Sequence, residues 1–171
     1  MKKTIYLAGG CFWGVQAYMK KLPGVVETET GYANGKTENP SYEEVCKNNT
    51  GHAETVRVVY DPDILPLGIL LHAFFKVVDP TQWNRQGEDV GTQYRNGVFY
   101  IDEGDQPIIA EMVEHLQKMH HEKVVTEVKE LENFYPAEEY HQHYLDKNPT
   151  GYCHINLFDA EEFIRENGLE K

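Results

Sequence analysis

The sequence predicts an α+β fold, a two-layer sandwich in which helices cover a mixed β-sheet. Strand-like runs rich in β-branched and aromatic residues alternate with helix-like runs along the 171-residue chain. The sequence contains no internal repeat and no low-complexity linker. A chain of this length buries a sizeable core without metal or disulfide staples. We therefore expect one domain over residues 1–171.

The first elements follow from local composition. Residues 4–8 have the composition of a short strand, and Gly9-Gly10 then allow a tight turn. A helix over about 13–22 ends at Pro23, since proline cannot continue the helical hydrogen-bond ladder. Further strands are expected at 25–33, 53–60, 96–102 and 124–131, and further helices at 41–47, 66–78, 106–123 and 136–147.

Two segments lack a regular period. Residues 79–95 contain a proline and two glycines and are expected to form a long loop, a kind of loop that often has a function. The chain after Pro149 is also loop-like, so we expect a long irregular carboxy-terminal tail. The run 106–123, by contrast, repeats apolar residues at three- and four-residue spacing, as a helix laid on a sheet does.

Composition excludes several classes of protein. The formal charge of −12 and the scattered basic residues disfavour a nucleic-acid partner, and no stretch reaches the ~20 apolar residues of a membrane span. Cys11, Cys46 and Cys153 are too few and too widely spaced for a disulfide framework. Because no targeting segment precedes them, we expect the protein in the reducing cytoplasm, and we expect a monomer.

The segment Gly10-Cys11-Phe12-Trp13-Gly14 places a thiol between a strand and a helix and follows it with two large aromatic residues. At a helix N-terminus the unpaired amide groups and the helix dipole favour an anion, so we expect a thiolate nucleophile at Cys11. The segment alone leaves a buried structural cysteine open. A lipoprotein signal is excluded, because the preceding apolar stretch is about five residues and such signals need roughly 7–15.

Glu54 is the next candidate. Counting by two along the strand 53–60 puts it on the same face as Val56, Val58 and Tyr60. If that face is buried, desolvation raises the carboxyl pKa and leaves an acid able to donate a proton at neutral pH. An ordinary solvated carboxylate at a frayed strand end is the alternative.

For three further candidate site residues, composition alone indicates no catalytic or binding role. Tyr42 follows Asn39-Pro40-Ser41 at a helix start and Tyr94 ends the long loop, but with eleven tyrosines in the chain either one is more often packing than chemistry. Asp89 is by default a solvated loop carboxylate.

The ordered motifs together resemble peptide methionine sulfoxide reductases of the A type. The motifs span nearly the whole chain: Gly10-Cys11-Phe12-Trp13-Gly14, Asn39-Pro40-Ser41-Tyr42-Glu43-Glu44-Val45-Cys46, Thr50-Gly51-His52-Ala53-Glu54, Asn84-Arg85-Gln86-Gly87, Asp89-Val90-Gly91-Thr92-Gln93-Tyr94 and Gly151-Tyr152-Cys153. This family reduces the S epimer of methionine sulfoxide, free or in proteins, back to methionine and so repairs oxidised proteins.

The resemblance implies a role for each matching residue. Cys11 would attack the sulfoxide sulfur and become a sulfenic acid, and Glu54 would protonate the sulfoxide oxygen. The hydroxyls of Tyr42 and Tyr94 would hydrogen-bond that oxygen. The remaining implied roles are apolar walls around the substrate methyl group at Phe12 and Trp13, a substrate-orienting carboxylate at Asp89, and a recycling thiol at Cys153.

The resemblance also implies how the enzyme is regenerated. Cys153, in a loop of about residues 149–158, would form a disulfide with Cys11, and thioredoxin, or dithiothreitol in vitro, would reduce it without a bound cofactor. This chain has one carboxy-terminal cysteine where some relatives have two, so a single resolving step is expected. Cys46, inside a short helix-like stretch, is expected to be a buried structural cysteine.

Competing functions remain open from the residues alone. A metal site is disfavoured, because His141 and His143 stand two apart on an expected helix and no zinc-binding spacing occurs. A cysteine hydrolase would use Cys11 with a distant histidine such as His52. A non-enzymatic thiol redox sensor would pair Cys11 with Cys153 without turnover.

Overall fold

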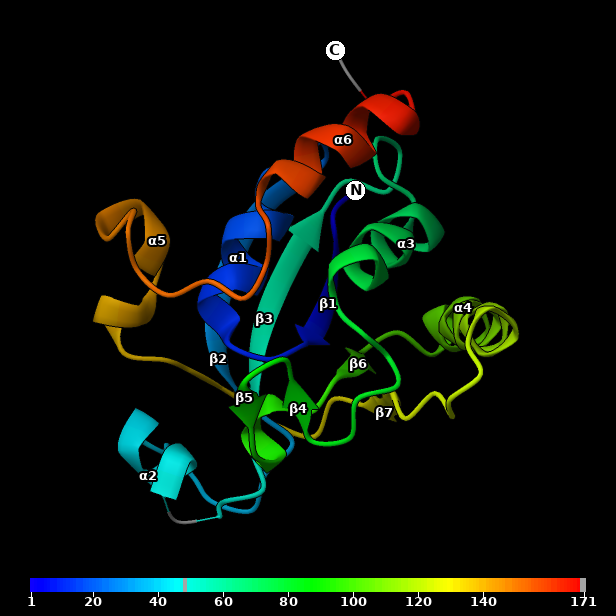
Figure 1. Cartoon of the computed structure of the whole chain (residues 1–171). Coiled ribbons are helices and arrows are strands. Elements are labelled where there is room, and N and C mark those ends of the chain that lie inside the picture. The colour runs from blue at the N-terminus through cyan, green and yellow to red at the C-terminus, as the bar shows by residue number, and fades with distance from the viewer. Residues whose placement is uncertain (48, 170–171) are drawn as a thin grey trace.

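A computed structural model describes residues 1–47 and 49–169, and a six-stranded sheet organises them (Figure 1). The strand order is β7-β6-β1-β3-β2-β8. The bounds are β1 Lys3–Ala8, β2 Val25–Ala33, β3 Ala53–Tyr60, β6 Gly97–Tyr100, β7 Glu127–Glu130 and β8 Phe134–Pro136. Neighbouring strands are antiparallel except β6 and β7, which are parallel. The predicted mixed sheet is confirmed.

The helices are α1 Phe12–Met19, α2 Tyr42–Lys47, α3 Leu67–Val77, α4 Gln106–Met119, α5 Tyr144–Lys147 and α6 Phe158–Glu166. In Figure 1, α1 and α3 lie over the central strands β1 and β3, with α6 beside them. Three short 3-10 turns lie at Thr92–Tyr94, Glu103–Asp105 and Glu139–His141. The helical layer therefore covers the middle of the sheet, as the two-layer prediction requires.

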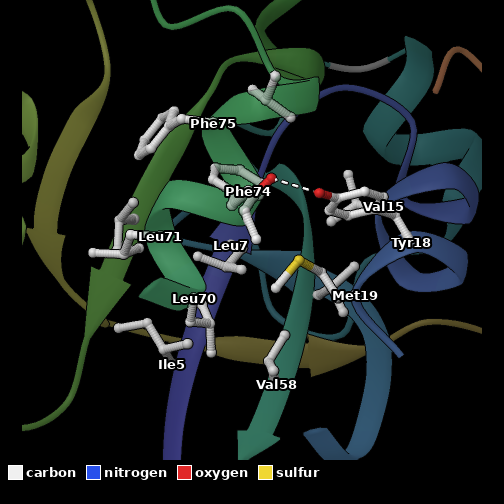
Figure 2. Close-up of a cluster of buried hydrophobic side chains, with 14 of the residues drawn as sticks. Ile5, Leu7, Val15, Tyr18, Met19, Val58, Leu70, Leu71, Phe74 and Phe75 are labelled. Carbon is white, nitrogen blue, oxygen red and sulfur yellow. Dashed lines mark hydrogen bonds between the residues drawn. The ribbon is translucent and has the colours of Figure 1, made fainter. Parts of the chain in front are cut away.

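The core lies between this helical layer and one face of the sheet (Figure 2). Strand positions two apart point the same way, so Ile5, Leu7 and Val58 meet the helices, and all three side chains are fully buried. The Tyr18 hydroxyl donates a hydrogen bond of 2.8 Å to the Ala73 carbonyl in α3 (Figure 2). That bond satisfies a buried hydroxyl and links α1 to α3.

The opposite face of the sheet carries polar and aromatic side chains. Arg57 pairs with Glu29 across β2 and β3, with 3.1 Å between Nε and Oε1. Tyr6 of β1 packs against Phe134 of β8 with ring centroids 5.1 Å apart.

The predicted helix over 136–147 is wrong. The chain there forms β8, a 3-10 turn and the short α5, and His143 takes the left-handed conformation with φ 51°. The cause is nonlocal: the Gln142 side chain pairs with both backbone groups of Thr30, at 2.9 Å each, and so ties the segment to the edge of β2. A continuous helix over 136–147 would lose these two hydrogen bonds between Gln142 and the backbone of Thr30.

Two smaller differences concern the loop and the tail. The predicted loop 79–95 contains a two-stranded hairpin, β4 Arg85–Gln86 with β5 Asp89–Val90. The tail is irregular only as far as Leu157, because α6 follows and buries Ala160 and Phe163 in the main core.

Candidate active site

Cys11 lies at the N-terminus of α1, where the sequence places it. Gly10 provides the turn from β1 with a φ of 84°, a conformation that favours glycine. Cys11 is the N-cap residue of α1 and only 7 % exposed. A side chain at Gly9 would also meet Val78, 2.7 Å from the added Cβ, so the turn packs directly on α3's end.

The resting protonation state of Cys11 differs from the expected thiolate. Burial raises the pKa of the Cys11 thiol well above its usual value, and the Glu54 carboxylate raises it further. The hydrogen bond from the Trp13 amide favours the thiolate but does not outweigh burial. Cys11 therefore rests as a thiol, since the helix N-terminus is itself buried.

Glu54 confirms the prediction that its strand face is buried. The residue is 1 % exposed, and its Oε1 accepts a 3.1 Å hydrogen bond from the Phe12 amide at the start of α1. Its Oε2 is buried and has no hydrogen-bond partner among the described residues. Burial raises the pKa of Glu54 to about 8. A protonated carboxyl thus lies beside the first turn of α1, next to Cys11.

Tyr42 is the first residue of α2, and Tyr94 ends the 3-10 turn Thr92–Tyr94. Burial, and after it the Glu54 carboxylate, raises the pKa of both phenols, so both stay protonated at neutral pH. Tyr42 begins α2 just after Ser41, whose hydroxyl accepts from the Glu44 amide while the Glu44 carboxylate accepts from the Ser41 amide.

Glu138 fixes the start of α2 against the sheet. Its Oε2 accepts a hydrogen bond from the Tyr42 amide at 3.0 Å, and its Oε1 accepts one from the Tyr32 hydroxyl at 2.8 Å. No local pattern around Glu138 indicated this role, because its partners are about 100 residues away in the sequence.

Trp13 and Phe12 belong to an aromatic cluster centred on His141. The Trp13 indole Nε1 donates to His141 Nδ1 at 2.9 Å, and its ring stacks on Tyr144 with centroids 3.7 Å apart. The rings of Phe12 and Tyr42 lie 5.2 and 4.5 Å from the His141 ring. His141, considered in the sequence only as a metal ligand, instead packs among these aromatic rings.

The loop around Cys153 lies on the first turn of α1. A Cβ added at Gly14 would be 3.1 Å from the Cys153 sulfur, so the thiol packs on bare helix backbone close to Cys11. The Cys153 thiol donates to the Ile155 carbonyl at 3.1 Å, and burial raises its pKa. Asp89 joins this loop: its Oδ2 accepts a 3.1 Å hydrogen bond from the Tyr152 hydroxyl.

Cys46 differs from its prediction. It lies on α2 one turn after Tyr42 and is exposed, so the expectation of a buried structural cysteine is wrong. All three cysteines are free thiols in the structure. Across residues 1–47 and 49–169, no group of histidine, cysteine and acidic side chains is arranged to hold a metal ion. Within the same ranges, every helix is too short or too polar to cross a bilayer.

Comparisons with known proteins identify the family of this chain. The family model of peptide methionine sulfoxide reductase matches residues 3–171. The peptide methionine sulfoxide reductase MsrA of Lachnoclostridium phytofermentans is 59 % identical over 162 residues, which cover 94 % of this chain and 98 % of that protein.

Solved structures give the same result. Mxr1 from Saccharomyces cerevisiae in its reduced form matches with a TM-score of 0.85 and 43 % identity, over 91 % of each chain. Mxr1 in complex with Trx2 matches with a TM-score of 0.60 and 29 % identity, over 84 % of each chain. The chain therefore belongs to the peptide methionine sulfoxide reductases of the A type, a family of oxidoreductases.

Proposed function

We propose that this protein reduces methionine-S-sulfoxide, free or in proteins, to methionine, with Cys11 as the nucleophile. The observation that carries the proposal is the buried Glu54 carboxyl, protonated at neutral pH and held beside Cys11 by the Phe12 amide. A sulfoxide oxygen is a poor leaving group until it is protonated, so a thiol attack on sulfur needs a neutral acid close by.

In the first step the Cys11 sulfur bonds to the sulfoxide sulfur while Glu54 protonates the oxygen. The Glu54 carboxylate left behind takes the Cys11 proton, which agrees with a centre that rests fully protonated. The substrate S–O bond then breaks as the oxygen, protonated a second time by Glu54, leaves as water. A water molecule bonds to the Cys11 sulfur and returns its proton to Glu54 while the S–S bond to the substrate breaks. Methionine leaves, reduced by two electrons, and Cys11 is left as a sulfenic acid. Tyr42 and Tyr94 add hydrogen-bond donors to the oxygen without adding charge.

In the second step Cys153 attacks the sulfur of the Cys11 sulfenic acid. The S–S bond forms, the S–O bond breaks, and the hydroxyl leaves with the Cys153 proton as water. The position of Cys153 against Gly14 supports this pairing. Thioredoxin then exchanges with the disulfide, as the Mxr1–Trx2 complex of a relative suggests, and dithiothreitol replaces it in vitro.

Phe12 and Trp13 are the proposed walls for the substrate methyl group, and Asp89 the group that orients the substrate. Tyr144 and His141 fix the Trp13 ring, which supports a rigid apolar wall on that side. We take residues 1–171 as one catalytic domain, because Ile155 and α6 pack into the same core as the sheet. We expect it to act as a monomer in the cytoplasm, with no bound cofactor.

The two alternative functions are less well supported. For a hydrolase, His52 would have to serve Cys11, but its Nε2 donates to the Thr37 carbonyl at 2.7 Å and its ring lies edge-on to Tyr135. A redox sensor needs no acid beside the thiol, and it leaves Glu54 without a role.

Two measurements test the proposal. Racemic methionine sulfoxide is incubated with the protein and dithiothreitol, and the epimers are then resolved; loss of the S epimer alone is expected, and an unchanged S epimer would refute the function. Without reductant, one equivalent of substrate should lower the protein mass by two hydrogens, the signature of a disulfide. A gain of one oxygen would mean that no thiol resolves Cys11.

A further inference from the structure

The histidine that follows Cys153 is bound to the turn before Cys11. The His154 side chain is 8 % exposed, and its Nε2 lies 3.0 Å from the Gly9 carbonyl oxygen. A carbonyl only accepts hydrogen bonds, so Nε2 carries the proton and donates it. This bond joins the carboxy-terminal loop to the strand-to-helix turn that positions the nucleophile.

The surface under the loop is shaped to receive it. A Cβ at Gly10 would be 3.0 Å from His154 Nε2, and one at Gly14 would be 3.3 Å from His154 Nδ1 and 3.1 Å from the Cys153 sulfur. Any larger residue at either position would push against the loop. The two glycines of the first motif therefore make room for the imidazole and the thiol together.

A second anchor lies on the other side of Cys153. Tyr152 donates to Asp89, and His154 Nδ1 lies 3.9 Å from the same carboxylate oxygen. His154 Nδ1 is buried and has no hydrogen-bond partner among the described residues, and burial lowers the His154 pKa, so the ring is neutral when docked. Cys153 is thus held between two anchored neighbours.

We propose that His154 is a positioning residue for the second step, holding the Cys153 loop docked on α1 through its hydrogen bond to Gly9. The inference rests on the proposed function, in which Cys153 resolves the Cys11 sulfenic acid. Docking before the reaction keeps the resolving thiol at a high effective concentration, so its attack does not wait for the loop to find its place. We expect no part for His154 in the first step, because its hydrogen bond is to the Gly9 carbonyl and not to a reacting group.

The test is a single-turnover experiment on the full chain without reductant. Methionine release and the loss of one free thiol report the first step, and the loss of a second free thiol, that of Cys153, reports the second. His154→Ala should release methionine at the wild-type rate but form the disulfide about 10-fold more slowly, the effect expected for losing one hydrogen bond that holds the loop. His154→Gln should restore most of the rate, because its amide nitrogen can donate to Gly9 as Nε2 does. His121→Ala, at an exposed histidine, is the matched control.

Each outcome decides the inference. Disulfide formation in His154→Ala at the wild-type rate would refute it, and so would an equal slowing in His154→Gln, which would indicate packing in place of the hydrogen bond. Gly14→Ala provides a second test that leaves His154 intact: the added methyl should displace the loop and slow the same step, and an unchanged rate would count against docking. If the wild type releases methionine but forms no disulfide, the proposed resolving step itself fails.

Discussion

Replacing Glu54 with glutamine tests the chemistry at the centre of the site. Glutamine keeps the side-chain length and an oxygen to accept the Phe12 amide hydrogen bond, but it has no acidic proton. With a pKa of about 8, Glu54 is about nine-tenths protonated at pH 7. A carboxyl with an ordinary pKa of about 4.3 would be protonated in roughly one molecule in 500. Burial of the Glu54 side chain therefore accounts for nearly all of the protonated carboxyl that is present at pH 7 for the first step.

We expect Glu54→Gln to slow methionine formation about 10²–10⁴-fold, the usual contribution of a general acid, or about 3–5 kcal/mol in the barrier. The assay is rapid-quench single turnover over a range of pH. The wild-type rate should fall above pH about 8, as Glu54 loses its proton, and the variant should lack this fall. Glu43→Gln, at an exposed carboxylate beside Tyr42, is the control.

Two results would refute this reasoning. A burst of methionine in Glu54→Gln within a few-fold of the wild type would mean that the proton comes from another group. A wild-type rate of methionine formation that rises with pH through pH 8 would mean that the reactive form of the centre has lost a proton. The fully protonated state would then not be the reactive one.

Three further predictions follow from the structure. The raised folded-state pKa of Glu54 makes stability depend on pH: the contribution of Glu54 to the free energy of unfolding is fully present below its unfolded-state pKa near 4.3 and is lost as pH rises to about 8. Urea unfolding should therefore show that the wild type loses about 5 kcal/mol of unfolding free energy relative to Glu54→Gln over that range, and the same pH dependence in both proteins would contradict the burial of the carboxyl. Cys153→Ser should release one methionine per molecule and then stop with thioredoxin as the only reductant, yet turn over with dithiothreitol; continued cycling with thioredoxin would assign resolution to Cys46. Gly35→Ala should lower the free energy of unfolding by about 3 kcal/mol, since the added Cβ would lie 2.2 Å from the His52 ring; an unchanged unfolding midpoint would show that the ring moves freely.

Local pattern was enough to predict the elements that carry the chemistry. Alternation by two along β3 predicted that Glu54 faces the core, and the Gly-Gly turn predicted Cys11 at the start of α1. The pKa of Cys11 was not predictable in the same way. A helix N-terminus favours a thiolate, but at Cys11 burial of the thiol outweighs this effect. That burial depends on segments far apart in the sequence, including the carboxy-terminal loop that packs on Gly14.

The predictions from sequence that were wrong failed either because contacts between distant residues decide the structure or because a local pattern was overlooked. The helix expected over 136–147 fails because Gln142 binds Thr30, more than 100 residues earlier in the chain. The helix α6, in contrast, left a readable signal, since Ala160, Phe163 and Ile164 repeat at helical spacing. Cys46 was expected to be buried because cysteines usually are, but α2 is a short surface helix and only Val45 is buried in it.

The raised pKa values of Cys11, Glu54, Tyr42 and Tyr94 have a consequence for substrate choice. Four ionisable side chains meet there, yet at neutral pH the group holds its protons and carries almost no formal charge. It therefore attracts a sulfoxide by the polarity of the S–O bond, which is the same in a free amino acid and in any polypeptide. Salt weakens attraction between charges far more than hydrogen bonds to a neutral dipole. We therefore expect such a centre to act on oxidised methionines in acidic and basic surroundings alike, although the chain around it has a net charge of −12.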